Sequence, residues 1–181
     1  MRVGLFFGTF NPLHNAHLGI CNKLLEKKII DEVWLVLTPH SPYKKSDDLV
    51  DAYIRLDMIN EAIAKLQNIK VSDIEFGMEK PNYTYLTLKE VKKKFPDNEY
   101  MIIMGEDNFL NFDKWKNNKF IKSNFQIISY PRSKKSVNNI FDHYFDLSSS
   151  TIRDLVKRKS DISSLVPDEI YLYIKEKGLY R

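Results

Sequence analysis

Residues 2–17 read RVGLFFGTFNPLHNAH, and this stretch decides the fold class. It opens with a short apolar, aromatic-rich run, Arg2 to Phe7, which Gly8 ends. A run this short predicts a buried strand rather than a helix. After the polar segment, apolar residues recur at helical spacing from Leu18 to Leu25. The stretch therefore predicts a strand, a polar loop and a helix, which is how a βαβ unit begins.

The same alternation continues along the chain. Further strands are predicted at 32–37, 69–74, 100–104 and 125–130, and further helices at 50–65 and 84–95. Strands that alternate with helices predict right-handed βαβ units, and so an α/β, Rossmann-like, doubly wound parallel sheet with helices on both faces. Near the end, Pro167 at a first helical position and Gly178 at a helix end predict a closing helix. We expect a single domain over 1–181, with a sheet core to about 147 and a small C-terminal helical part over about 148–181.

Composition excludes several classes of protein. With 28 basic and 24 acidic residues, the net charge of +4 is too small to indicate a nucleic-acid partner. The single cysteine, Cys21, excludes a disulfide framework and a cysteine-rich zinc site. No apolar run approaches the roughly 20 residues of a membrane span, and the N-terminus lacks a signal-peptide pattern. We expect a cytoplasmic protein that binds small molecules and neither nucleic acid nor membrane, and the sequence leaves open whether it forms a homo-oligomer.

Polar segments follow the predicted strands at 8–17, 38–45, 105–109 and 131–135, and a serine cluster opens a helix within 147–155. In open parallel sheets, ligands bind outside the carboxyl ends of the strands. The agreement of these segments on one edge of the sheet predicts a ligand site there.

The first of these segments carries the strongest chemical pattern. Gly8 allows close approach of the backbone to a ligand, and Asn15 is a favourable helix cap. His14 and His17 then lie three residues apart at a helix N-terminus, where an anion is stabilised. Two imidazoles there can hydrogen-bond the oxygens of an anion. The pair alone fits a zinc pair or two ordinary surface histidines as well as it fits an anion site, although a zinc site needs further ligands.

Two other features allow more than one interpretation. In LSSSTIRDL (147–155), Thr151 and Asp154 fit a capping box, which would make the hydroxyls ordinary helix-start chemistry. The same segment fits a phosphate site formed by a helix N-terminus with Arg153 beside it, and the residues alone do not separate the two. Trp115 fits a core position better than a stacking platform.

These motifs resemble those of a known family. GTFNPLHNAH (8–17) resembles the GTFxPxHxGH signature of the HxGH nucleotidyltransferases, and LSSSTIR (147–153) resembles their ISSTxIR signature. PNYTYLTL (81–88) is similar to the SYTIDTL segment of bacterial nicotinate-nucleotide adenylyltransferases. MGEDNFLNFDKW (104–115) is similar to their GADxxxxxxxW segment, and IYLYIKEKGLY (170–180) to their C-terminal helix. The resemblance covers essentially the whole chain.

The resemblance implies a reaction in which the phosphate of nicotinate mononucleotide attacks the α-phosphorus of ATP. The products are deamido-NAD, an intermediate of NAD biosynthesis, and pyrophosphate, and no covalent enzyme intermediate forms. Catalysis then depends on positioning and on stabilisation of charge. Mg²⁺ would be carried on the ATP phosphates, with no metal held by the protein itself.

The resemblance also implies three groups of site residues. The catalytic residues, which would stabilise charge on the phosphates, are His17, His14 and Arg153. The residues that would hold ATP are Gly8, Thr9, Phe10, Gly105, Asp107, Arg132, Ser149 and Ser150. Those that would hold the mononucleotide are Lys44 at its phosphate and Thr84, Tyr85 and Trp115 at its ring.

The chain departs from the family pattern at several positions. Ala16 replaces a glycine, Leu86 an aspartate and Glu106 an alanine. Leu86 and Glu106 leave open the choice between nicotinate and nicotinamide mononucleotide. The alternatives are a pantetheine-phosphate adenylyltransferase, a cytidylyltransferase or a non-catalytic nucleotide-binding relative. His14 stands where pantetheine enzymes commonly carry threonine, and cytidylyltransferases have another C-terminal signature, so the nicotinate branch is favoured.

Overall fold

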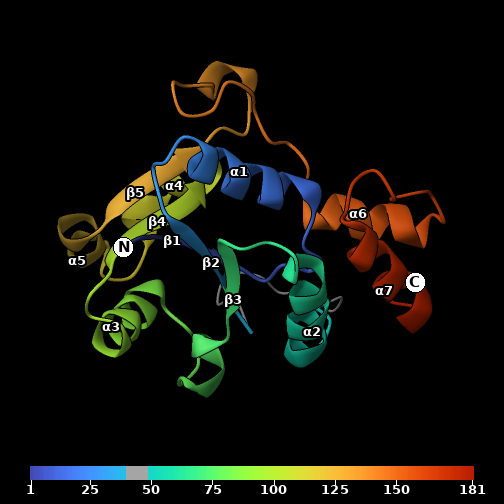
Figure 1. The fold of residues 1–181 in the computed structure, drawn as a ribbon, viewed down its shortest axis with the longest axis horizontal. Helices are drawn as coiled ribbons and strands as arrows, with labels where there is room; N and C mark the ends of the chain where they lie inside the picture. Colours follow the sequence, from blue (N-terminus) through green and yellow to red (C-terminus); the bar gives the residue numbers. More distant parts are fainter. Residues whose placement is uncertain (40–48) are drawn as a thin grey trace.

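The computed structural model describes residues 1–39 and 49–181 and has a five-stranded parallel sheet at its centre (Figure 1). The strands are β1 (Arg2–Gly8), β2 (Glu32–Leu37), β3 (Ile69–Ser72), β4 (Glu99–Gly105) and β5 (Gln126–Tyr130). Their order is β3-β2-β1-β4-β5, and every neighbouring pair is parallel. This order confirms the predicted Rossmann-like, doubly wound sheet.

Helices connect the strands as the alternation predicts. The α-helices are α1 (Asn15–Glu26), α2 (Ala52–Ile63), α3 (Thr84–Lys94), α4 (Glu106–Leu110), α5 (Asn118–Asn124), α6 (Ser149–Lys157) and α7 (Asp168–Lys177). Short 3₁₀ turns are η1 (Ile74–Gly77), η2 (Phe112–Lys114) and η3 (Lys134–Ser136). Helices α4 and α5 were not predicted, because each is too short to show a helical period.

The sheet buries both of its faces. Along β1, Val3 and Leu5 pack into one apolar cluster, with α3 and α5, while Phe6 packs into the other, with α1, α2 and α7. Because alternate residues of a strand face opposite sides, burial of both faces requires the nearly continuous apolar runs seen in the sequence.

Strand β3 is shorter than predicted. The pattern Ile69 to Ile74 continues to alternate, but the strand ends at Ser72. The Ser72 hydroxyl accepts a hydrogen bond from the backbone N–H of Ile74 (3.4 Å), which turns the chain into η1. A local serine turn therefore ends the strand before its apolar pattern ends.

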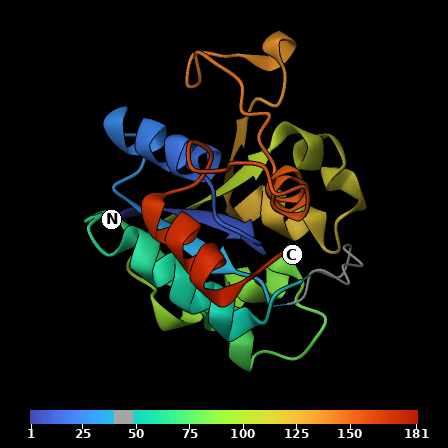
Figure 2. The ribbon, with the colours of Figure 1, turned by 90° about the vertical axis from the view of Figure 1, so that its right-hand side faces the viewer.

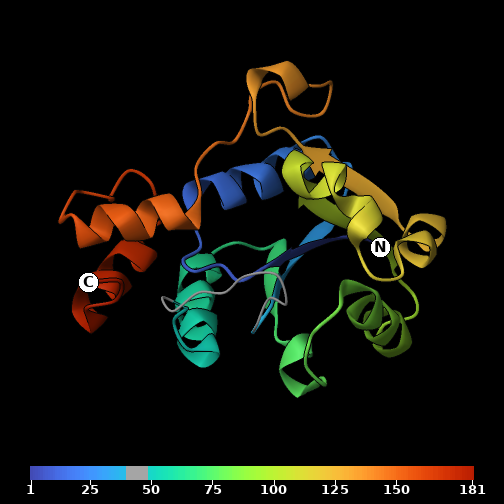
Figure 3. The same ribbon diagram turned by 180° about the vertical axis from the view of Figure 1, so that it is seen from behind.

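Helices α6 and α7 lie together at the end of the molecule opposite α3 and α5 (Figures 1 and 3). Helix α7 packs against α2 (Figure 2). Pro167 is the N-cap of α7, so the helix begins at Asp168, one residue later than predicted. Among the described residues, no helix is long and apolar enough to cross a membrane.

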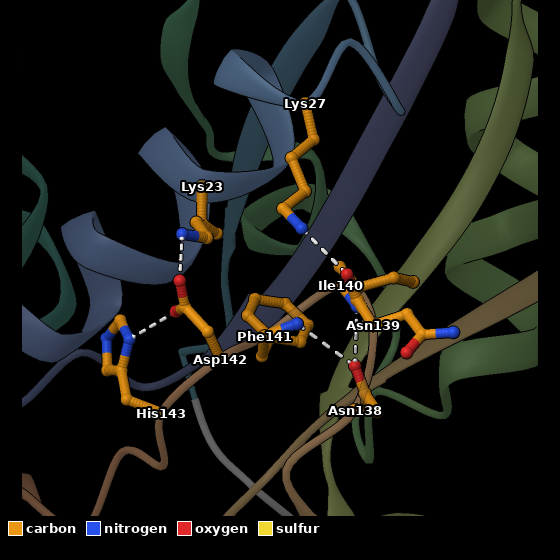
Figure 4. A network of polar contacts seen from close by, with 8 residues as sticks. All are labelled: Lys23, Lys27, Asn138, Asn139, Ile140, Phe141, Asp142 and His143. Atoms are coloured by element: carbon orange, nitrogen blue, oxygen red, sulfur yellow. Dashed lines mark hydrogen bonds and ion pairs between the residues drawn. The ribbon is translucent and has the colours of Figure 1, made fainter.

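The segment that joins β5 to α6 is anchored on α1 (Figure 4). Lys23 Nζ lies 2.8 Å from an Asp142 carboxylate oxygen, and Lys27 Nζ donates to the carbonyl of Asn139 at 2.7 Å. His143 Nδ1 lies 2.8 Å from the other Asp142 oxygen. These contacts fix the path by which the chain reaches the first turn of α6.

Candidate active site

The strand order reverses at β1, which lies between β2 and β4. In an open parallel sheet this reversal opens a crevice at the carboxyl ends of the two diverging strands. The loop between β1 and α1 leaves from that edge, and β4 ends beside it at Gly105. The fold therefore places the GTFNPLHNAH segment where a ligand binds.

The N-terminus of α1 is capped by His14, so the expectation that Asn15 is the cap was wrong. His14 has extended backbone, and Asn15 is already the first helical residue. The Asn15 amide instead donates to the carbonyl of Ser164 at 3.0 Å, and its backbone N–H donates to the carbonyl of Leu165. Asn15 thus joins α1 to the segment before α7.

The two histidine rings are stacked. Their centroids are 3.6 Å apart with an angle of 22° between the planes. The backbone N–H of His14 donates to Nδ1 of His17 at 3.3 Å. A ring nitrogen that accepts a hydrogen bond carries no proton, so His17 holds its proton on Nε2. This tautomer provides an N–H donor at the far edge of the ring.

His14 is buried, with 2% of its surface exposed. Burial, aided by the positive charge of Arg132, lowers the pKa of His14 to about 3, so the ring is neutral near pH 7. Its Nδ1 has no hydrogen-bond partner among the described residues. A buried polar atom without a partner is costly, and a ligand oxygen or N–H at this position would relieve that cost.

Gly8 makes room for an aromatic ring. A Cβ at position 8 would lie 3.0 Å from the ring of Phe10, which is closer than carbon atoms pack. Phe10 has φ 41°, and its ring meets the His17 ring edge-on at a centroid distance of 5.1 Å. Gly8 thus leaves room for the Phe10 ring, which packs against His17. That Gly8 also allows close approach of a ligand stays a prediction.

The first turn of α6 meets the loop after β1. Ser149 Oγ donates to the carbonyl of Pro12 at 2.9 Å, and Arg153 Nη1 donates to the carbonyl of Asn11 at 2.9 Å. Arg153 Nε is buried and has no hydrogen-bond partner among the residues that the structure describes. The first turn of α6 therefore lies beside the loop that leads into α1, with the Arg153 guanidinium bonded to the same loop, an arrangement that favours a polyanion.

The capping box predicted from Thr151 and Asp154 was wrong. The N-cap of α6 is Ser148, whose Oγ accepts the backbone N–H of Thr151 at 3.1 Å. Ser148 Oγ also lies 2.9 Å from Ser150 Oγ, which is exposed. Because Ser148 caps the helix, the hydroxyls of Ser149 and Ser150 are not needed as caps.

Arg132, which lies just after β5, contacts both the segment that leads to α6 and the first turn of α4. Its Nη1 donates to the carbonyls of Phe145 (3.1 Å) and Leu147 (3.3 Å), and its Nε lies 3.5 Å from an Asp107 oxygen. A Cβ at Gly105 would overlap the Asp107 carboxylate, so Gly105 permits this position of Asp107. The predicted ATP residues Gly105, Asp107 and Arg132 thus lie together.

The residues predicted to hold the nicotinate ring lie on the other side of the sheet from α1. Thr84 and Tyr85 open α3, and Trp115 follows η2 with its ring centroid 5.5 Å from that of Phe112. Tyr85 and Trp115 are half-buried against the apolar cluster that also includes Phe7 of β1. Trp115 thus contacts the core and keeps part of its surface exposed. Lys44 lies outside the described residues.

Arg55, which has the largest fully buried side chain in the described part of the protein, was not predicted as a functional residue. Its guanidinium donates to the carbonyls of Thr9 (2.6 Å), Thr38 (3.1 Å), Pro39 (2.9 Å) and Val50 (2.8 Å). It therefore holds together the loop after β1, the end of β2 and the approach to α2. The sequence does carry one signal for the burial of Arg55. It lies three and four residues before the apolar Met58 and Ile59, so it shares the buried face of α2 with them.

Glu75, Asn82 and Thr87 form a second group that was not predicted from the sequence, and they lie next to Thr84 and Tyr85 along the chain or in contact with the start of α3. Glu75 is 1% exposed and accepts a hydrogen bond from the Thr87 hydroxyl at 2.7 Å. Asn82 Nδ2 donates to the Glu75 carbonyl at 3.1 Å. Burial raises the pKa of Glu75 to about 7. These contacts join η1 to the first turns of α3 and so set the position of the predicted ring-binding residues.

Comparison with known proteins agrees with this geometry. The cytidylyltransferase-like family model matches residues 5–164. A protein of Flavobacterium psychrophilum named "Probable nicotinate-nucleotide adenylyltransferase" is 42% identical, with all of both sequences covered. One of the same name from Christiangramia forsetii is 39% identical over 99% of this chain and 98% of its own.

A solved structure shares the fold. The Plasmodium falciparum nicotinic acid mononucleotide adenylyltransferase complexed with NaAD superposes with a TM-score of 0.79 at 20% identity, over 99% of this chain and 97% of its own. The family model and the full-length relatives show more than the fold. The chain belongs to the cytidylyltransferase-like family and, within it, to the nicotinate-nucleotide adenylyltransferases.

Proposed function

We propose that this protein joins ATP and nicotinate mononucleotide to form deamido-NAD and pyrophosphate. A phosphate oxygen of the mononucleotide attacks the α-phosphorus of ATP, and the bond from that phosphorus to the β-phosphate oxygen breaks. The electron pair of that bond leaves with pyrophosphate, so nothing is oxidised or reduced. The observation that carries the proposal is the stacked pair of His14 and His17 at the N-terminus of α1, facing the N-terminus of α6.

His17 and His14 act on the phosphates in this proposal. The Nε2–H of His17 donates to the α-phosphate as negative charge develops there, since the His14 backbone holds the ring in that tautomer. His14, neutral and buried, and the backbone of Thr9 and Phe10 hold phosphate oxygens. Neutral donors stabilise the developing charge without a strong attraction for the substrate before reaction.

Arg153, Ser149 and Ser150 grip the β- and γ-phosphates and neutralise the leaving pyrophosphate. Two features of Arg153 support this role. Its buried Nε has no hydrogen-bond partner among the described residues, and its Nη1 is held by the Asn11 carbonyl. Gly105 and Asp107 contact the adenosine ribose, beside Arg132. Thr84, Tyr85 and Trp115 hold the nicotinate ring, and Lys44 the mononucleotide phosphate.

Mg²⁺ enters on the ATP phosphates in this proposal. Within residues 1–39 and 49–181, no group of three or more His, Cys, Asp or Glu side chains is arranged to hold a metal ion. The phosphates of ATP supply the oxygen ligands that Mg²⁺ prefers. The ion would reduce the charge that Arg153 and the two helix N-termini must balance.

Release of pyrophosphate, measured in parallel with three acceptors, tests the proposal. ATP and Mg²⁺ are incubated with nicotinate mononucleotide, nicotinamide mononucleotide or phosphopantetheine. We expect release and dinucleotide formation with nicotinate mononucleotide at the highest kcat/KM. Preference for phosphopantetheine would place the enzyme in another branch, and no product with any acceptor would support a non-catalytic relative.

A further inference from the structure

Tyr180 lies in the short segment after α7, which folds back toward the loop after β1. Helix α7 ends at Lys177, and Gly178 and Tyr180 both have positive φ, 62° and 63°. Positive φ is unfavourable for a residue other than glycine. The segment adopts it and buries the Tyr180 ring, of which 8% remains exposed.

The Tyr180 hydroxyl is hydrogen-bonded in the interior of the protein. It donates to Asn11 Oδ1 at 2.9 Å across a sequence separation of 169 residues, and this hydrogen bond is buried. Arg55 and Arg153 lie close enough for their charges to act on the phenol, while its burial raises its pKa well above the ordinary value. The hydroxyl therefore stays protonated and remains a donor throughout the neutral range.

Asn11 transmits this contact to the phosphate site. Asn11 is 2% exposed, and its Oδ1 also accepts the backbone N–H of Val50 at 3.3 Å. Its backbone carbonyl accepts from Arg153 Nη1. The side chain and the carbonyl belong to one residue, so the hydrogen bond from Tyr180 limits the direction in which the carbonyl holds Arg153. Asn11 thus links two hydrogen bonds, one from Tyr180 to its side chain and one from Arg153 to its backbone carbonyl.

We propose that Tyr180 is a positioning residue for ATP: through Asn11 it orients the guanidinium of Arg153 toward the polyphosphate. Tyr180 itself touches no substrate in this scheme. The inference rests on the proposed function for the identity of the polyphosphate. Loss of the Tyr180 hydroxyl should therefore weaken the binding of ATP and leave the binding of the mononucleotide unchanged. The reason is that the contacts lead from Tyr180 to Arg153 and not to α3.

The test is the dissociation constant for ATP with Mg²⁺, measured by calorimetry with no mononucleotide present. Tyr180→Phe keeps the buried ring and removes one hydrogen bond, so we expect ATP to bind about three- to tenfold more weakly. Binding of nicotinate mononucleotide should not change. Tyr173→Phe, on the half-buried face of α7 and outside this network, is the matched control and should bind ATP like the parent.

A double-mutant cycle separates positioning from a general effect on the fold. Tyr180→Phe added to Arg153→Ala should weaken ATP binding no further. An equal loss in both backgrounds, an equal loss for ATP and mononucleotide, or unchanged ATP binding in Tyr180→Phe would each overturn the inference. Since the cycle measures binding alone, failure of the parent to form dinucleotide would count against the proposed function without deciding this test.

Discussion

Replacing Glu75 by glutamine should change how stability depends on pH. Burial raises the pKa of this carboxyl from 4.5 to about 7. Below pH 4.5 the side chain is protonated in both the folded and the unfolded states. Between pH 4.5 and 7 the unfolded state loses its proton while the folded state keeps it, so the unfolded state gains stability. The shift corresponds to about 3 kcal/mol, which the folded state loses as pH rises through this window.

The assay is urea unfolding of the parent and of Glu75→Gln at intervals from pH 4 to 8. His14 has the opposite effect, because its lowered pKa makes the folded state more stable as pH rises from about 3 to 6.5. The informative quantity is therefore the difference in free energy of unfolding between parent and variant. We expect the parent to lose about 3 kcal/mol relative to Glu75→Gln between pH 4.5 and 7 and nothing further above it.

The control variant is Glu79→Gln, an exposed glutamate four residues along the chain. Its difference from the parent should stay flat over the same range. A flat difference for Glu75→Gln, or one that grows in the parent's favour as pH rises, would refute the claim that Glu75 is held protonated by burial.

Three further predictions concern the phosphate site and its support. His17→Ala should lower kcat for pyrophosphate release by about 10²–10³ because it removes a donor to the developing charge; an unchanged kcat would exclude that role. Arg153→Lys replaces a guanidinium, which can donate two parallel hydrogen bonds to a phosphate, by an ammonium, which cannot, and should lower kcat/KM for ATP about tenfold. Equal kcat/KM in variant and parent would count against the contact. Arg55→Lys should lower the free energy of unfolding by about 2–4 kcal/mol, because an ammonium cannot satisfy all four buried carbonyls. The exposed Arg158→Lys is its control, and equal unfolding midpoints for the two variants would contradict the argument.

The strands were predictable wherever a polar residue bounds an apolar run. Strand β2 has the predicted bounds because Asp31 and Thr38 flank VWLVL and its preceding glutamate. The end of β3 was not predictable, since Ile74 continues the alternation and only the Ser72 turn breaks it. Apolar periodicity reports which face is buried and does not report a local side-chain hydrogen bond.

In the candidate site, too, some residues were predictable from sequence patterns and others were not. His14, His17, Ser149 and Arg153 lie in recognisable motifs, and the structure brings them together around one loop. The spacing of Arg55 places it on the buried face of α2, but its contacts were not predictable, because its partners are backbone carbonyls, which every residue has. Ser149 and Arg153 also contact backbone carbonyls, but they stand in a recognisable motif, whereas no motif surrounds Arg55.

The contacts that complete the proposed phosphate site join distant parts of the chain. The loop after β1 meets Ser149, Arg153 and Tyr180 across 137, 142 and 169 residues. During synthesis the histidine pair emerges early, whereas its partners emerge only when most of the chain has been made. Loops of this length also make these contacts slow to close. A nascent or truncated chain that lacks Tyr180 therefore carries the recognisable histidine motif before it can form the arrangement that we propose to hold ATP.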